Sequence, residues 1–202
     1  VDKTAEIKLL GNAVKDSAPH PALHKQTTNV TEQERIAVRE ILHTPKGETV
    51  LDFGQNIAGY VEINICGKRG ERIVLSHAEV LDKDGNFYTE NMRSARNLCT
   101  YVLSGENDVF KPTFSFQGFR YVRLDECPEN IAAENFTAVV IHTDMERIGS
   151  FTCGNADLNK LYSNIIWGQK GNFVDTPTDC PQRDERLGWT GDAQVFSGTA
   201  AF

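Results

Sequence analysis

The feature that most constrains this fold is a set of short segments in which apolar and polar side chains alternate. The run GYVEINIC shows it best, because Val61, Ile63 and Ile65 alternate with Glu62 and Asn64. Successive side chains of a strand point to opposite faces of a sheet. The pattern therefore predicts a half-buried strand with the three apolar residues inside.

Similar segments follow one another over residues 35–150, with turn residues between them and no helical period. They include ERIAVREIL, ETVLDF, ERIVLSHAEVL, LCTYVLSG, FSFQGFRYVRL and ENFTAVVIHTD. Many short strands without helices between them predict an antiparallel β-sandwich or jelly roll, so the fold class is mainly β. The sandwich core is expected to take the alternating aromatic residues Tyr101, Phe114, Phe116, Phe119 and Tyr121.

Two further features within this region have structural interpretations. His77 shares a strand face with Leu75 and Ile73, which favours a buried structural histidine over a metal ligand. Asp84-Gly85 favours a tight turn over a calcium loop, because the spacing of the surrounding acids does not fit an EF-hand.

The two ends of the chain have a different character. Residues 1–34 lack any period and predict a linker or the tail of a preceding domain. After residue 150, Asn155 is a suitable N-cap for a helix over 156–170, with Leu158, Leu161, Tyr162 and Ile165 on one face. A long loop over 172–191 and the beginning of a second helix over 193–202 follow. One helix and part of another cannot bury a core of their own, so residues 151–202 are expected to be the incomplete start of a helical domain.

Composition excludes several classes of function. The formal net charge of −7 disfavours a nucleic-acid binder, and no apolar run approaches the length of a membrane span. The five cysteines lie far apart without a CxxC pair, which argues against a disulfide framework and a structural zinc site. Unpaired thiols favour a cytoplasmic location, although the opening Val suggests that the chain was cut from a longer one whose export signals are unknown.

The run NFVDTPTDCPQRDERLGWTGDA concentrates acidic residues, and we call its residues 173–192 the acidic loop. It contains five carboxylates together with two arginines and a tryptophan. Crowding of carboxylates raises the pKa of at least one of them, which can create a proton donor near neutral pH. Carboxylates beside an aromatic ring also suit a sugar. A solvated loop pinned by Arg183 and Arg186, and a calcium site, remain alternatives.

The run DTPTDCPQRDERLGWTGDAQ resembles the signature of bacterial α-L-rhamnosidases, an inverting glycoside hydrolase family. The segments DFGQNIAGYVEI, HAEVLDKDGNFYTEN, FSFQGFRYVRL and SFTCGNADLNKLYSNIIWGQKGNF are also similar to that family, in its order. The resemblance implies a β-sandwich domain over 35–150, joined to the first helix or two of an (α/α)6 catalytic barrel over 151–202.

The resemblance also implies roles for individual residues. Glu185 falls on the general acid of the family, Asp179 and Asp192 on residues that bind rhamnose hydroxyls, and Trp189 on an aromatic residue of the sugar pocket. Arg183 and Asp184 lie in the motif and are expected to support the loop or tune Glu185. In that family the general base is a second Glu later in the barrel, so the resemblance implies a base beyond residue 202.

These roles define the expected function. A parent enzyme would remove terminal α-L-rhamnose from rhamnosides without a metal or other cofactor, while the fragment alone would be inactive. The expected partners are rhamnose-containing glycosides or oligosaccharides, without nucleic acid or membrane, and the oligomeric state stays open. The alternative is a non-catalytic carbohydrate-binding or structural β-sandwich module, since fold alone does not decide function.

Overall fold

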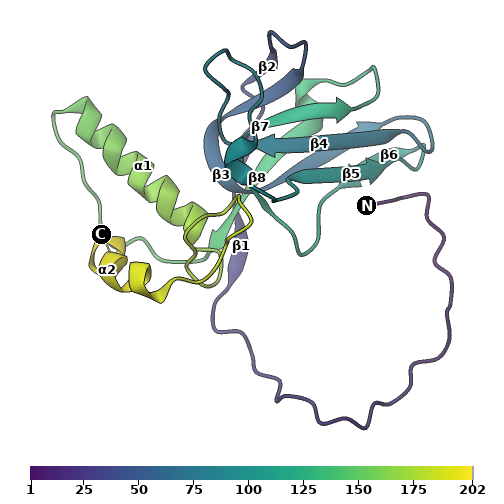
Figure 1. Cartoon of the computed structure of the whole chain (residues 1–202), viewed down its shortest axis with the longest axis horizontal. Coiled ribbons are helices and arrows are strands. Elements are labelled where there is room, and N and C mark those ends of the chain that lie inside the picture. Colours follow the sequence, from purple (N-terminus) through teal and green to yellow (C-terminus); the bar gives the residue numbers. More distant parts are fainter. Residues whose placement is uncertain (202) are drawn as a thin grey trace.

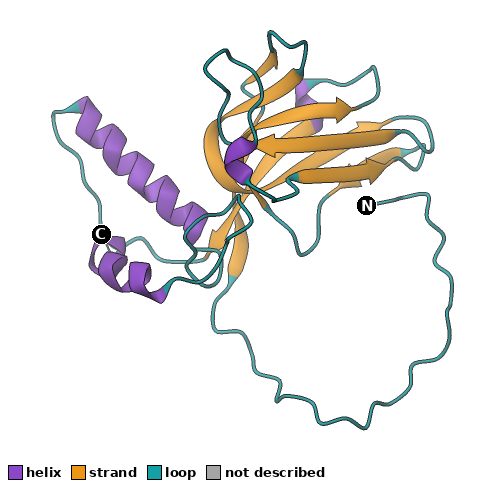
Figure 2. Cartoon of the chain, viewed as in Figure 1, coloured by secondary structure: helices purple, strands orange, loops and turns teal. Residues whose placement is uncertain are grey.

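A computed structural model describes residues 1–201, drawn in Figure 1 and coloured by element type in Figure 2. All strand pairs between named strands are antiparallel, and two helices follow the last strand, which confirms the predicted fold class. The strands are β1 (Val30–Ala37), β2 (Glu40–His43), β3 (Thr49–Cys66), β4 (Arg72–Ala78), β5 (Leu98–Val102), β6 (Asn107–Phe110), β7 (Gln117–Glu126) and β8 (Phe136–Thr143). Two short 3-10 helices, η1 (Glu90–Met92) and η2 (Ala133–Asn135), lie between strands.

The long strand β3 joins two groups of strands. Its first part pairs with β2 and β7, and its last part pairs with β8 and β6, so the sheet changes partners along one strand. Gly59 lies at the change, opposite both Gln117 and Val140. A Cβ atom there would lie 2.0 Å from the backbone oxygen of Val139, so only glycine fits this close approach.

The larger of two hydrophobic clusters among the described residues forms the main core, with side chains from β3 to β8. Val61, Ile63 and Ile65 enter it, while Glu62 is half-buried and Asn64 is exposed, as the alternation predicts. His77 is also buried, and its Nδ1 lies 3.0 Å from the backbone oxygen of Asn97. The structural interpretation of this histidine is therefore confirmed.

The aromatic residues separate into two sets. Tyr101 and Phe119 are buried in the core as predicted, and Phe116 and Tyr121 are half-buried. The prediction is wrong for Phe114, which is fully exposed in a loop with a φ of 61°. The alternation of the run FSFQGFRYVRL holds only from Gln117 onwards, where β7 begins.

The N-terminal segment is tied to the sheet at both of its ends. The amino group of Val1 donates to the backbone oxygen of Thr100 at 2.7 Å, and Asp2 forms an isolated bridge with Val102 of β5. Residues 5–28 then run as a wide loop back to β1 (Figure 1). The first strand begins at Val30 and pairs with β8, so the sheet starts earlier than the sequence predicts.

The two helices are α1 (Ala156–Asn172) and α2 (Thr190–Ala200). The predicted cap of α1 is confirmed, because the Asn155 side chain accepts the backbone N–H groups of Asp157 and Leu158. The predicted second helix is also present and begins three residues earlier than expected; its last expected residue, Phe202, lies outside the described residues. Trp167 packs against the core of the sandwich, and Lys170 pairs with Glu34 of β1.

Further observations concern the cysteines, one turn and the helices. The five cysteines are free thiols. Asp84-Gly85 lies in a turn in which Gly85 has a φ of 83° and donates to the backbone oxygen of Asp82 at 3.0 Å. Within residues 1–201, none of the helices has the length and apolar character needed to cross a bilayer.

Candidate functional site

The acidic loop runs from the end of α1 into the first turn of α2 and lies against the sandwich. Gly118 of β7 faces Pro181 and Gln182 so closely that an added Cβ atom would lie 2.7 Å from the side chain of Gln182. Arg186 donates to the backbone oxygen of Phe116 at 3.2 Å and to that of Arg183 at 3.1 Å. These contacts fix the path of a segment that contains little regular structure.

Four of the predicted site residues converge in this loop. Nη2 of Arg183 lies 3.1 Å from Oδ2 of Asp179 and 2.8 Å from Oε2 of Glu185, so one guanidinium group holds two carboxylates side by side. The neighbouring Asp184 accepts a hydrogen bond from the hydroxyl of Ser94 at 2.6 Å. Arg93 lies 3.3 Å from Glu185 and 3.8 Å from Asp184.

The charges of this cluster affect its titration. Burial opposes ionisation of Asp179, but hydrogen bonds, chiefly from Arg183, outweigh it and lower the pKa of that carboxyl. The hydrogen bond from Ser94 lowers the pKa of Asp184, with Arg93 adding to the effect. The hydrogen bond with Asp179 raises the pKa of Arg183. For both aspartates the direction is opposite to the rise that crowding of carboxylates alone predicts.

The remaining two predicted residues lie apart from this cluster. Trp189 is the N-cap residue of α2 and is 46% exposed, while Asp192 is exposed in the first turn of that helix. Among the described residues, neither side chain takes part in the ion pairs around Arg183. The structure thus brings together Asp179, Arg183, Asp184 and Glu185, but not Trp189 and Asp192.

A possible metal-binding group overlaps the same cluster. Ligand atoms of Asp179, Cys180 and Glu185 lie within 4.8 Å of one another. A calcium ion prefers six to eight oxygen ligands, whereas one of these three atoms is sulfur and both carboxylates already contact Arg183. The arrangement therefore fits an arginine-bridged acid pair better than the calcium alternative.

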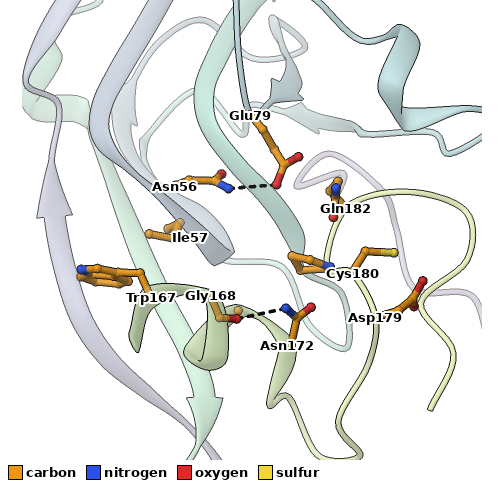
Figure 3. A pocket seen from close by; sticks show the side chains of 11 residues that line it. Asn56, Ile57, Glu79, Trp167, Gly168, Asn172, Asp179, Cys180 and Gln182 are labelled. Carbon is orange, nitrogen blue, oxygen red and sulfur yellow. Dashed lines mark hydrogen bonds between the residues drawn. The ribbon is translucent and has the colours of Figure 1, made fainter. Parts of the chain in front are cut away.

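A cavity of about 230 Å³ lies beside the cluster, between the sandwich, α1 and the acidic loop (Figure 3). Asn56 of β3 donates to Glu79 at 2.9 Å on one side, and Trp167 of α1 lines another. Asp179 and Cys180 border the cavity from the acidic loop. Asp179 therefore pairs with Arg183 and also lines the cavity.

Sequence reasoning missed Arg93 and Ser94. They follow η1 in the sandwich and lie about 90 positions before the carboxylates they contact. The run NMRSARN has no periodicity or motif that marks these residues as part of a site. Only the packing of the acidic loop on the sandwich reveals the contact.

Comparisons with known families divide the chain into two parts. Residues 42–142 match the family described as the bacterial α-L-rhamnosidase concanavalin-like domain. Residues 146–202 match the family described as the bacterial α-L-rhamnosidase 6 hairpin glycosidase domain. The second match includes the whole acidic loop.

Curated relatives carry the same family name. An α-L-rhamnosidase of Streptomyces avermitilis is 45% identical over 170 residues, which are 84% of this chain and 16% of the relative. An α-L-rhamnosidase of an Alteromonas species is 42% identical over 180 residues, covering 87% of this chain and 19% of the relative. The chain therefore spans less than a fifth of the length of these relatives.

Solved structures of similar proteins superpose on most of the chain. The α-L-rhamnosidase of Aspergillus terreus does so with a TM-score of 0.83 and 43% identity, over 87% of this chain and 20% of the other. The Streptomyces avermitilis enzyme, solved in complex with L-rhamnose, gives a TM-score of 0.82 and 44% identity, over 87% and 17%.

Proposed function

Since the chain belongs to the bacterial α-L-rhamnosidase family, we propose that it is part of a longer glycoside hydrolase that removes terminal α-L-rhamnose from rhamnosides. The Streptomyces relative was solved with L-rhamnose, which supports this sugar as the recognised group. The partners of the enzyme would accordingly be rhamnose-containing glycosides or oligosaccharides.

The proposed organisation has three parts. Residues 1–34 are a linker or the tail of a preceding domain, although β1 begins within them, and residues 35–150 are the β-sandwich domain. Residues 151–202 begin the helical catalytic domain, an (α/α)6 barrel in this family. The exposure of Leu158 and Leu161 on α1 supports this division, because such an apolar face requires further helices to cover it.

The observation that carries the proposal is the bridge made by Arg183 between Asp179 and Glu185. A glycosidase site needs one group that grips the sugar hydroxyls and, beside it, an acid that reaches the glycosidic oxygen. Asp179 would bind rhamnose hydroxyls and Glu185 would protonate the leaving oxygen. Arg183 fixes the separation of the two carboxyl groups, and Asp184 anchors the loop through Ser94.

Trp189 and Asp192 would complete the sugar pocket from the start of α2. An indole ring packs on the apolar face of a pyranose, and a carboxylate accepts hydrogen bonds from its hydroxyls. Both side chains are exposed in this structure and are therefore free to receive a ligand. Their sugar-binding roles follow from the family motif.

Inversion requires a second carboxylate on the opposite face of the sugar, about 6.5–9.5 Å from the acid, to activate water. Asp179 and Asp184 approach Glu185 from within the same loop, so neither takes that position. The base would come from the part of the barrel that follows residue 202 in this family. We therefore propose that the chain alone does not hydrolyse rhamnosides.

The test is the stereochemistry of the first product. A full-length enzyme containing this chain should release β-L-rhamnose from an aryl α-L-rhamnoside, as followed by proton NMR before mutarotation, whereas the isolated chain should release none. Release of the α anomer first would contradict the inverting mechanism. Sugar binding without hydrolysis by the full-length protein would favour a non-catalytic module instead.

A further inference from the structure

The turn after η1 has a conformation that is unusual for its sequence. The backbone N–H of Ala95 donates to the oxygen of Met92 at 3.1 Å, which closes a turn with Arg93 at its second position. Arg93 has φ 57° and ψ −122°, values that glycine adopts readily and other residues avoid. Residues held in such conformations occur preferentially where surrounding contacts and function require them.

The sandwich core holds this turn on both sides. Met92, immediately before Arg93, is 1% exposed. On the other side the backbone oxygen of Asn97 accepts the backbone N–H of His77 at 2.9 Å and lies 3.0 Å from its Nδ1. The turn is therefore attached to a buried residue of β4 and should be rigid compared with a free loop.

The side chains of this rigid turn reach the acidic loop. The Ser94 hydroxyl donates to Asp184 at 2.6 Å, and Arg93 donates to Oε2 of Glu185 at 3.3 Å. Arg183, from the acidic loop itself, contacts the same Oε2 atom at 2.8 Å. The Oε2 atom of Glu185 thus contacts one arginine of its own loop and one arginine of the sandwich.

We propose that Arg93 and Ser94 are positioning residues through which the sandwich domain fixes the carboxyl group of Glu185 for proton transfer. The inference rests on the proposed role of Glu185 as the acid. It gives the sandwich a part in the reaction, because the turn would set the direction of Glu185 and the charge around it.

A contribution to folding alone does not explain this contact. The Arg93 side chain is 56% exposed, and ion pairs between exposed side chains contribute little to stability. The strained backbone of Arg93 lowers the stability of the folded state. Removing this arginine should therefore leave the protein folded, while a misplacement of the acid by about 1 Å can reduce the rate about 100-fold.

The test uses the variants R93G, R93K and S94A in a full-length enzyme that contains this chain. Glycine suits the backbone of position 93, so R93G removes the guanidinium group without disturbing the turn. R72A is the matched control, because Arg72 makes a similarly exposed ion pair with Glu126 of the sandwich, away from the acidic loop. The readouts are Tm, and kcat and KM measured separately for a rhamnose-containing disaccharide.

R93G should lower kcat by about 10-fold or more with little change in KM and an unchanged Tm. R93K should keep part of the kcat that R93G loses. S94A should lose less kcat than R93G, and R72A should lose none.

An R93G enzyme with the kcat and KM of R72A would overturn the proposal. Glu185→Gln, measured in parallel, separates this failure from that of the proposed function. If only Glu185→Gln loses activity, the positioning role is wrong and the acid assignment stands. If neither variant loses activity, both the positioning role and the acid assignment fail.

Discussion

The sandwich buries its large apolar side chains, whereas the C-terminal helical segment leaves many of its own exposed. Leu51, Ile63 and Phe119 have no exposed surface in the sandwich, whereas Leu161 of α1 is 54% exposed and Val195 of α2 is 88% exposed. Figure 2 shows the helices extending away from the strands on one side. The difference indicates that the sandwich supplies its own core, while the helices depend on neighbours for theirs.

The two regions are attached through both apolar packing and polar contacts. Trp167 packs on the core, and Lys170 pairs with Glu34. Arg186 contacts Phe116, and Asp184 contacts Ser94. The candidate site lies on this attachment, so its geometry depends on both regions although only one of them has a closed core.

Substitution of one large apolar residue in each region should give the largest contrast. Phe119 is fully buried, with ring contacts to Phe53 at 5.8 Å and His77 at 5.0 Å, so Phe119→Ala should lower the free energy of unfolding by about 3–5 kcal/mol. Leu161→Ala should change it by less than about 0.5 kcal/mol, because its side chain is already exposed. Urea unfolding of the chain measures both, and similar losses would contradict the contrast.

A smaller loss of stability is expected when the pH is lowered, and it should originate at His77 in the sandwich. Burial, the largest cause, lowers the pKa of His77 to about 4. Below the ordinary histidine pKa of about 6.5, the unfolded chain binds a proton at this position that the folded chain does not. The contribution of neutral His77 to the free energy of unfolding is therefore complete above that pH and is lost as the pH falls towards 4.

The change between pH 7 and pH 5 should be about 2 kcal/mol of unfolding free energy from this residue. His77→Gln should remove that part of the pH dependence, whatever its effect at neutral pH. The exposed His24 provides the control, and His24→Gln should keep the full dependence. If the free energy of unfolding changes with pH equally in His77→Gln and His24→Gln, the buried histidine is not the source of that pH dependence.

The parts of the fold that the sequence predicts are those with a local signal. The alternation in β3 predicts the burial of Val61 and Ile65, and Asn155 marks the start of α1. The pairing of Val1 with β5 has no local signal, since the two segments lie about 100 positions apart. Phe114 fits the alternating pattern but is exposed, because the strand begins only at Gln117.

The candidate site divides in the same way. The motif from Asp179 to Asp192 is continuous in the sequence, so its carboxylates could be named as a group from the residues alone. Their pairing with Arg183 follows from the loop fold, which spacing does not specify. Arg93 and Ser94 were not predictable, because their contacts depend on how the loop docks on a turn of the sandwich.

The assignment of Glu185 as the general acid is tested most directly by one variant, Glu185→Gln. The test is whether its loss of kcat/KM depends on the leaving group of the substrate. Asp179→Asn and Asp192→Asn are the controls, because weaker sugar recognition should affect every substrate equally. The measurement is kcat/KM of full-length variants on a rhamnose-containing disaccharide and on a nitrophenyl rhamnoside, whose leaving group departs almost unaided.

Glu185→Gln keeps the shape of the side chain but removes the transferable proton. We expect it to lose at least about 100-fold on the disaccharide and much less on the nitrophenyl substrate. The two aspartate variants should lose similar factors on both substrates. An equal loss of Glu185→Gln on the two substrates would contradict the assignment and place the acid on another carboxyl group.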